Sequence, residues 1–179
     1  MFYDLTPATK KTVQTSVNGF SKENRFIGGQ LSTAWINKNA FKGAELLSIR
    51  AYAGFELSFD DTLKNSNNYR IGAEASVSLP RFYQPFRKIK ETRLYPPHTR
   101  LLVGYENYRK DYYYSKNIYR LQYEFNWKQS SNVEHVLSPL SITHIDAGNV
   151  SDSFSKQTIH NPALAANVYD EIILSSFYD

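Results

Sequence analysis

Two glutamates are the first residues in this sequence whose arrangement suggests chemistry. Glu56 and Glu74 fall on neighbouring extended segments, so a hairpin would be able to bring their carboxylates together. Paired carboxylates are the groups with which most glycosidases cleave a glycosidic bond. Arg50 and Arg70 lie close to them in the sequence, and a lattice of ion pairs is the simpler interpretation of four such residues. We therefore expect these glutamates to be structural.

The remaining chemistry-bearing residues form no recognisable catalytic or metal-binding set. Histidine occurs four times, at His98, His135, His144 and His160. None of them has the short paired spacing of a zinc site. Asp60, Asp61 and Asp111 lack the spacing of a calcium loop. Cysteine is absent, which excludes disulfides and thiol catalysis. We expect no enzymatic activity, no cofactor and no bound metal.

Composition excludes several broad classes of protein. The chain has 179 residues, of which 15% are aromatic and 21% are charged. That aromatic content is too high for a disordered chain. No apolar run approaches the roughly 18 residues of a membrane-spanning helix. The net charge of +4 is too small to predict binding to nucleic acid.

The elements that must position these side chains are β-strands, because apolar and polar residues alternate with a period of two. Residues 45–59 are the clearest case, since the odd positions are apolar and the even positions are largely polar. Residues 69–79 and 118–128 repeat the pattern. Weaker segments at 12–20, 26–36, 99–110, 141–145 and 171–178 bring the total to about eight strands.

The connections predict how these strands pair. None of them has the length and pattern of a crossover helix, so neighbouring strands should pair antiparallel in chain order. We interpret residues 1–179 as a single β-segment. Its predicted fold is an all-β, antiparallel, up-and-down transmembrane β-barrel, represented by about eight strands of a larger barrel.

A membrane barrel and a soluble sheet both alternate in this way, and three features favour the barrel. The clearest strands run eleven to fifteen residues, which is enough for the 9–11 residues that a membrane strand needs. Small residues such as Ala51 and Ala73 lie on the apolar face, where they would fill a soluble core poorly. Aromatic residues such as Trp35 and Trp127 gather near strand ends, as in the aromatic girdles of outer-membrane barrels.

In a barrel, the polar positions face the lumen. Opposite charges on adjacent strands are then able to pair across the wall. The lumen-facing charges predicted in this way are Arg50, Glu56, Arg70, Glu74, Glu106, Arg120 and Glu124.

Residues 26–31 and 35–47 resemble the early barrel strands of the BamA/TamA superfamily of outer-membrane assembly factors, also called bacterial surface antigens. The turn at residues 38–45 carries the resemblance most clearly. Its matching positions are Asn39, Phe41, Gly43 and Glu45. Later segments, at 79–82, 85–86 and 127–139, resemble the variant found in Bacteroidetes-type members.

The resemblance implies a barrel of about sixteen strands preceded by periplasmic POTRA repeats, of which this chain would form the N-terminal half of the barrel. It also implies that the first strand forms a lateral seam, which templates incoming strands by β-augmentation. The residues of that seam would be Thr12, Val13, Gln14, Thr15, Ser16, Val17 and Asn18. An ordinary edge strand explains their polarity equally well.

The function expected from this resemblance is assembly, insertion or translocation of proteins at the bacterial outer membrane. The expected partners are the lipid bilayer, nascent outer-membrane proteins and accessory assembly subunits, and nucleic acid is not among them. Two alternatives stay open. One is a passive porin or transport barrel, and the other is a soluble antiparallel β-sheet module that binds sugar or lipid.

Overall fold

The computed structural model describes residues 9–22, 26–58, 67–81, 96–111, 113–128, 132–148 and 170–178. All regular secondary structure within these ranges is β-strand, and they include no helix long and apolar enough to cross a membrane. The strands are β1 (Lys11–Lys22), β2 (Phe26–Asn37), β3 (Leu46–Ser58), β4 (Asn68–Leu79), β5 (His98–Lys110), β6 (Tyr114–Lys128), β7 (Glu134–Gly148) and β8 (Glu171–Tyr178).

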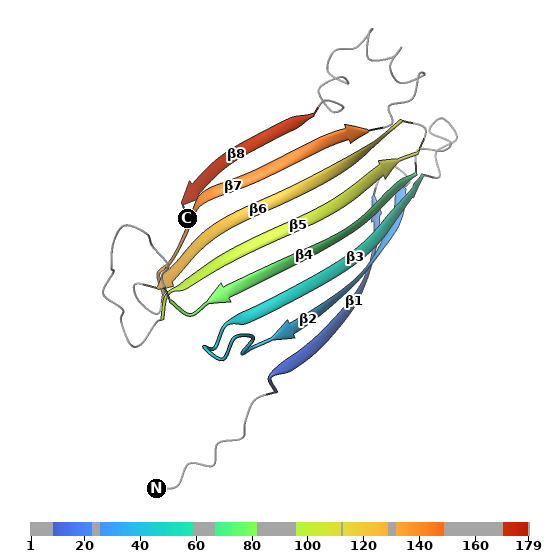
Figure 1. The fold of residues 1–179 in the computed structure, drawn as a ribbon. Helices are drawn as coiled ribbons and strands as arrows, with labels where there is room; N and C mark the ends of the chain where they lie inside the picture. Colours follow the sequence, from blue (N-terminus) through green and yellow to red (C-terminus); the bar gives the residue numbers. More distant parts are fainter. Residues whose placement is uncertain are drawn as a thin grey trace, which may run out of the picture.

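The eight strands form one antiparallel sheet in the order of the sequence (Figure 1). Each strand pairs with its neighbours in the chain, so β1 and β8 are the two edges of the sheet. The prediction of an all-β, antiparallel, up-and-down arrangement is confirmed. The described strands nevertheless form an open sheet, because the two edge strands do not pair with each other.

Strand β7 is much longer than predicted from residues 141–145. Its register shifts between Ser138 and Ser141 against β8, and a matching shift against β6 lies between Tyr123 and Phe125. This is a β-bulge, which inserts an extra residue and moves the following side chains to the opposite face. Pro139 lies in the bulge, where a missing N–H is tolerated. The apolar alternation therefore changes phase in mid-strand, and the pattern before the bulge went unrecognised.

In a soluble protein the apolar face of a sheet is buried and the polar face is exposed. In this sheet the apolar face is the more exposed of the two. Among the described residues, Ala34, Pro97 and Phe125 are the only apolar side chains that are buried. The face that carries the charges is less exposed, and Glu106 on it is only 8% exposed. The sheet thus has almost no apolar core, and its apolar residues lie outside.

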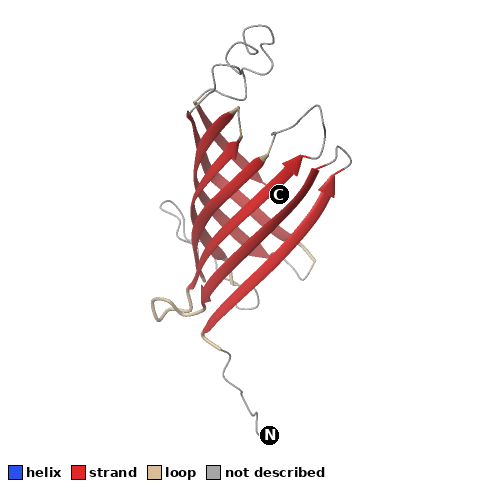
Figure 2. Cartoon of the chain, turned by 90° about the vertical axis from the view of Figure 1, so that its right-hand side faces the viewer, coloured by secondary structure: helices blue, strands red, loops and turns tan. Residues whose placement is uncertain are grey.

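The sheet is strongly curled, so that in Figure 2 some strands pass behind others. Side chains from alternate strands meet on the polar face, as Tyr52 of β3 and Glu106 of β5 do. Such contacts across an intervening strand, together with the lower exposure, identify the polar face as the concave one. The apolar face is therefore convex.

Candidate functional site

The convex face presents rows of apolar side chains that run across the strands. One row joins β2 to β7 through directly opposed residues: Trp35, Ile49, Ala75, Val103, Leu121 and Ile142. Exposure on this face is high, reaching 61% at Ile71 and 78% at Val17. A soluble monomer rarely leaves a continuous apolar surface of this kind uncovered, so the convex face is a candidate contact surface.

Aromatic clusters flank the apolar part of the convex face between β5 and β8. At one end, the His135 ring stacks between Trp127 and Tyr178, and the Tyr178 hydroxyl lies 2.7 Å from His135 Nδ1. At the other end, Tyr119 contacts both Tyr105 and His144.

These clusters set the height of the apolar band. From Tyr119 to Trp127 the strand rises about 27 Å at roughly 3.4 Å per residue. A barrel tilt of about 40° reduces this to ~21 Å, close to the apolar band of an outer-membrane barrel, which is about 25 Å tall. Polar residues follow beyond the second cluster, where Asn107 and Asn117 are hydrogen-bonded.

The concave face holds a hydrogen-bonded network whose side chains come from β3, β5 and β6. The Tyr52 hydroxyl donates to Glu106 Oε2 at 2.6 Å, and Arg120 Nη2 lies 3.5 Å from the same oxygen. Gly72 separates Tyr52 from Glu106 in the register. A Cβ at Gly72 would lie 2.5 Å from the Tyr52 ring, so only glycine lets the ring lie flat and reach Glu106.

The same device recurs on the neighbouring strands. Arg70 Nη2 donates to Gln30 Oε1 at 2.8 Å, and Gly54 lies between these two residues in the register. Gly104 lies between Glu74 and Arg120. Gly54 of β3 and Gly72 of β4 are thus the gaps across which long polar side chains contact each other on the concave face.

Sequence reasoning missed these contacts, although a signal for them exists. Three consecutive strands carry a Gly-x-Glu triplet, at residues 54–56, 72–74 and 104–106. In each triplet the glycine and the glutamate share the concave face, because side chains alternate along a strand.

The register places all seven predicted lumen-facing charges on the concave face. Arg120 pairs with Glu106, while Glu124 accepts a hydrogen bond from Gln122. The predicted pairing is only partial, because Arg50 and Glu74 face each other in the register without forming an ion pair.

The two glutamates considered for catalysis are not brought together. Glu56 lies opposite Asn68 and accepts its hydrogen bond, whereas Glu74 lies opposite Arg50, six positions further along β4. That offset corresponds to about 20 Å along the strand. A glycosidase pair needs its carboxyl groups within about 10 Å, so this arrangement is unsuited to that reaction.

No metal-binding group forms within the described ranges. His135 and His144 lie in the two aromatic clusters, and Asp111 forms an ion pair with Arg109. The other candidates, Asp60, Asp61 and His160, lie outside the described residues.

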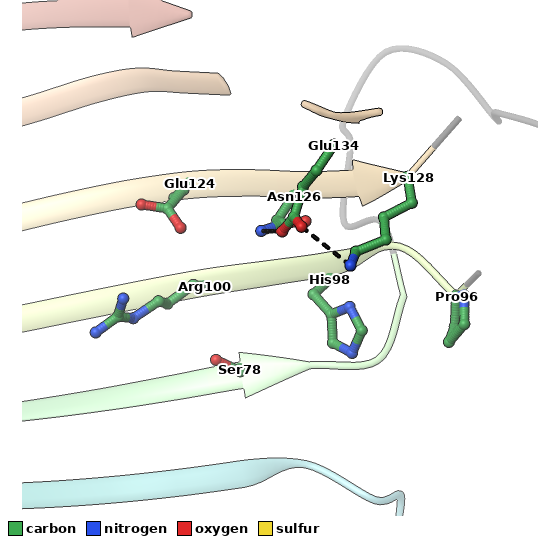
Figure 3. Close-up of a pocket in the computed structure, with 8 residues that line it drawn as sticks. All are labelled: Ser78, Pro96, His98, Arg100, Glu124, Asn126, Lys128 and Glu134. Carbon is green, nitrogen blue, oxygen red and sulfur yellow. Dashed lines mark hydrogen bonds and ion pairs between the residues drawn. The ribbon is translucent and has the colours of Figure 1, made fainter. Parts of the chain in front are cut away.

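A polar recess of about 600 Å³ lies at the end of the concave face where β5 begins (Figure 3). Lys128 Nζ forms an ion pair with Glu134 at 3.1 Å, and Asn126 donates to the same carboxylate at 2.7 Å. His98 and Arg100 also line the recess. Because acidic and basic groups are mixed here, the recess suits water and small polar solutes rather than one ligand charge.

Strand β1, which contains the predicted seam, is held to β2 by small polar contacts. The hydroxyls of Ser16 and Ser32 lie 2.7 Å apart, and those of Thr15 and Thr33 lie 3.3 Å apart. Further along, Gly19 opposes Gly29, so no side chains meet there. The other side of β1 pairs with no described strand, and its backbone is available to a further strand.

The turn between β2 and β3, which carries the family resemblance, is organised by two side chains. Glu45 accepts hydrogen bonds from the N–H groups of Phe41 and Gly43, and Asn39 accepts one from Ala44. The N–H groups of Glu45 itself and of Gly43 lower the pKa of the Glu45 carboxyl from its usual 4.5. The polar positions of the motif therefore fold the turn, whereas Phe41 is exposed.

Comparison of the chain with known protein families, with curated proteins and with solved structures found no match. The two faces, the open edge and the turn are therefore the features of the chain that bear on its function.

Proposed function

We propose that the chain forms part of the wall of a bacterial outer-membrane β-barrel, with lipid against its convex face and water against its concave face. The reversed burial of the two faces carries this proposal, because exposed apolar rows lie opposite a hydrogen-bonded polar face. Lipid covers the first without cost, and a hydrated lumen suits the second. Strands of 12–15 residues in β1–β7 are long enough to span the bilayer.

Within that class, we propose an assembly or insertion factor of the BamA/TamA superfamily. The turn at residues 38–45 supports it through its resemblance to the family, and β1 supports it through its open edge. An incoming strand would pair with β1 and be released as its own barrel closes. The proposed partners are lipid, nascent outer-membrane proteins and accessory subunits, and the work is mechanical rather than enzymatic.

A passive transport barrel is the second candidate. The polar recess and the wide polar face favour it, because both suit a water-filled passage. Ion conductance after reconstitution into planar bilayers, without any effect on the folding of client proteins, would support this candidate.

The membrane proposal is tested by the dependence of folding on detergent. The chain is refolded with and without micelles and followed by far-ultraviolet circular dichroism and sedimentation velocity. We expect a β-spectrum and a discrete species only with detergent. A folded, monodisperse species in plain buffer would overturn the proposal and favour a soluble β-sheet module.

The seam proposal is tested by disulfide crosslinking. The chain has no cysteine of its own that would form competing disulfides. Ser16→Cys is placed on β1, and Ser48→Cys on the internal strand β3 is the matched control. Each variant is mixed with an unfolded outer-membrane barrel chain that carries one cysteine in a terminal strand. We expect crosslinking at position 16 and none at position 48. Equal crosslinking yields at positions 16 and 48 would contradict the proposal that β1 forms a lateral seam.

A further inference from the structure

The two ends of the sheet differ in charge. Each end of the sheet is taken as the described residues that lie within three positions of a strand end or in the adjoining turn. The end where β1 begins has seven basic and two acidic residues, a net charge of +5. The opposite end, counted in the same way, has five basic and five acidic residues and is neutral. Among the described residues, the apolar convex face therefore lies between a basic end and a neutral one.

Four lysines at the basic end lie together at one corner of the sheet, which we call the lysine corner. It consists of Lys10, Lys11, Lys38 and Lys42. All four are exposed, and the Lys38 N–H donates to the Lys10 carbonyl at 2.8 Å, which brings the two chain segments together. No hydrogen bond or ion pair to a described residue neutralises any of their ammonium groups.

The lysine corner lies directly beyond the apolar band. Lys11 opposes Asn37 in the register, and the next outward pair along the same strands is Val13 with Trp35. A lysine in this position extends its apolar stem along the band and places its ammonium at the level of the lipid headgroups. Aromatic residues such as Trp35 are typical of that depth.

We infer that the lysine corner binds the phosphate groups of anionic phospholipids in the leaflet that this end of the sheet meets. The inference rests on the proposed membrane location and adds a lipid preference and a fixed orientation to it. A basic residue near an anionic surface raises affinity about fivefold, and the effect is lost at high salt. Four neighbouring lysines would enrich anionic lipid at this corner over zwitterionic lipid.

Both tryptophans of the chain report on this end, because Trp35 lies two residues from the end of β2 and Trp127 one residue from the end of β6. The folded chain is reconstituted with brominated phosphatidylglycerol or brominated phosphatidylcholine, each mixed with the unbrominated other lipid. Bromine in the acyl chains quenches neighbouring tryptophan fluorescence, and competition between the lipids gives their relative binding constants. We expect phosphatidylglycerol to be preferred by at least about fivefold at low salt, the effect of a single basic residue.

Two double variants with the same change in net charge make the test specific for one end. Lys38→Gln with Lys42→Gln should lower this preference several-fold, because two of the four ammonium groups of the lysine corner are removed. Lys110→Gln with Lys116→Gln, at the neutral end, should leave it unchanged. Circular dichroism checks that both variants fold. Equal affinity for the two lipids in the parent chain, or equal loss in both variants, would overturn the inference while leaving the membrane proposal intact. Absence of quenching by either lipid would instead contradict the membrane proposal.

Discussion

An arginine placed on one face of β1 or on the other tests whether lipid covers the convex face and water the concave face. Two adjacent residues allow the comparison at one depth along the strand. Val17 lies on the convex face and is 78% exposed, and Asn18 follows it on the concave face and is also exposed. Val17 is six residues from the start of β1 and five from its end. These separations are about 20 Å and 17 Å along the strand, so the residue lies near mid-depth of a membrane.

The two environments predict different costs for Val17→Arg. At mid-depth in lipid, an arginine costs about 2–4 kcal/mol, whereas an exposed site in water changes stability by less than about 0.5 kcal/mol. Asn18→Arg should be nearly neutral in either case, because its face meets water. The variants therefore differ by about 2 kcal/mol or more only if lipid covers the convex face.

Equilibrium unfolding by urea in zwitterionic micelles measures this difference. Zwitterionic micelles are needed because an anionic surface would attract either arginine. Unchanged m-values would show that the two variants unfold the same surface. Unfolding free energies that agree within about 0.5 kcal/mol would refute the assignment of the convex face to lipid.

Three further predictions concern the concave face and the turn. Gly72→Ala should destabilise the sheet by about 1–3 kcal/mol, because the new Cβ displaces the Tyr52 ring. Gly19→Ala should not, because its Cβ would meet nothing within 4 Å, and thermal unfolding in micelles compares the two variants. Tyr52→Phe should cost about 1–3 kcal/mol in urea unfolding because Glu106 loses a donor, and a loss equal to that of Tyr119→Phe, which removes an exposed phenol, would contradict the network. The lowered pKa of Glu45 predicts a contribution to stability that is present above pH 4.5 and is lost as the pH falls through the folded-state pKa. Glu45→Gln should therefore flatten the pH dependence of the unfolding midpoint. An unchanged pH dependence in this variant would exclude Glu45 as its source.

Alternation revealed most of the strands because it persists wherever one face is apolar throughout. Strand β3 is the clearest example, since its predicted and observed bounds differ by one residue at each end. The start of β6 was missed, because Ser115 and Asn117 are polar residues on the otherwise apolar face. Near the rim of the band, composition no longer distinguishes the two faces of a strand.

The candidate site was less predictable than the strands because it depends on register. The sequence places Tyr52 and Glu106 on polar positions, but only the pairing of β3, β4 and β5 brings them to 2.6 Å. Arg50 and Glu74 show the converse, since they are opposed in the register and still form no ion pair. Which charges share a face was therefore predictable, and which of them touch was not.

The alternating direction of the eight strands restricts how the two open edges can be joined. With an even number of strands, β1 and β8 run in opposite directions. A ring built only from antiparallel neighbours must contain an even total, so the strands that bridge these edges must themselves be even in number, zero included. One strand from a client would leave a parallel junction on one side of itself. A two-stranded hairpin would fit both edges.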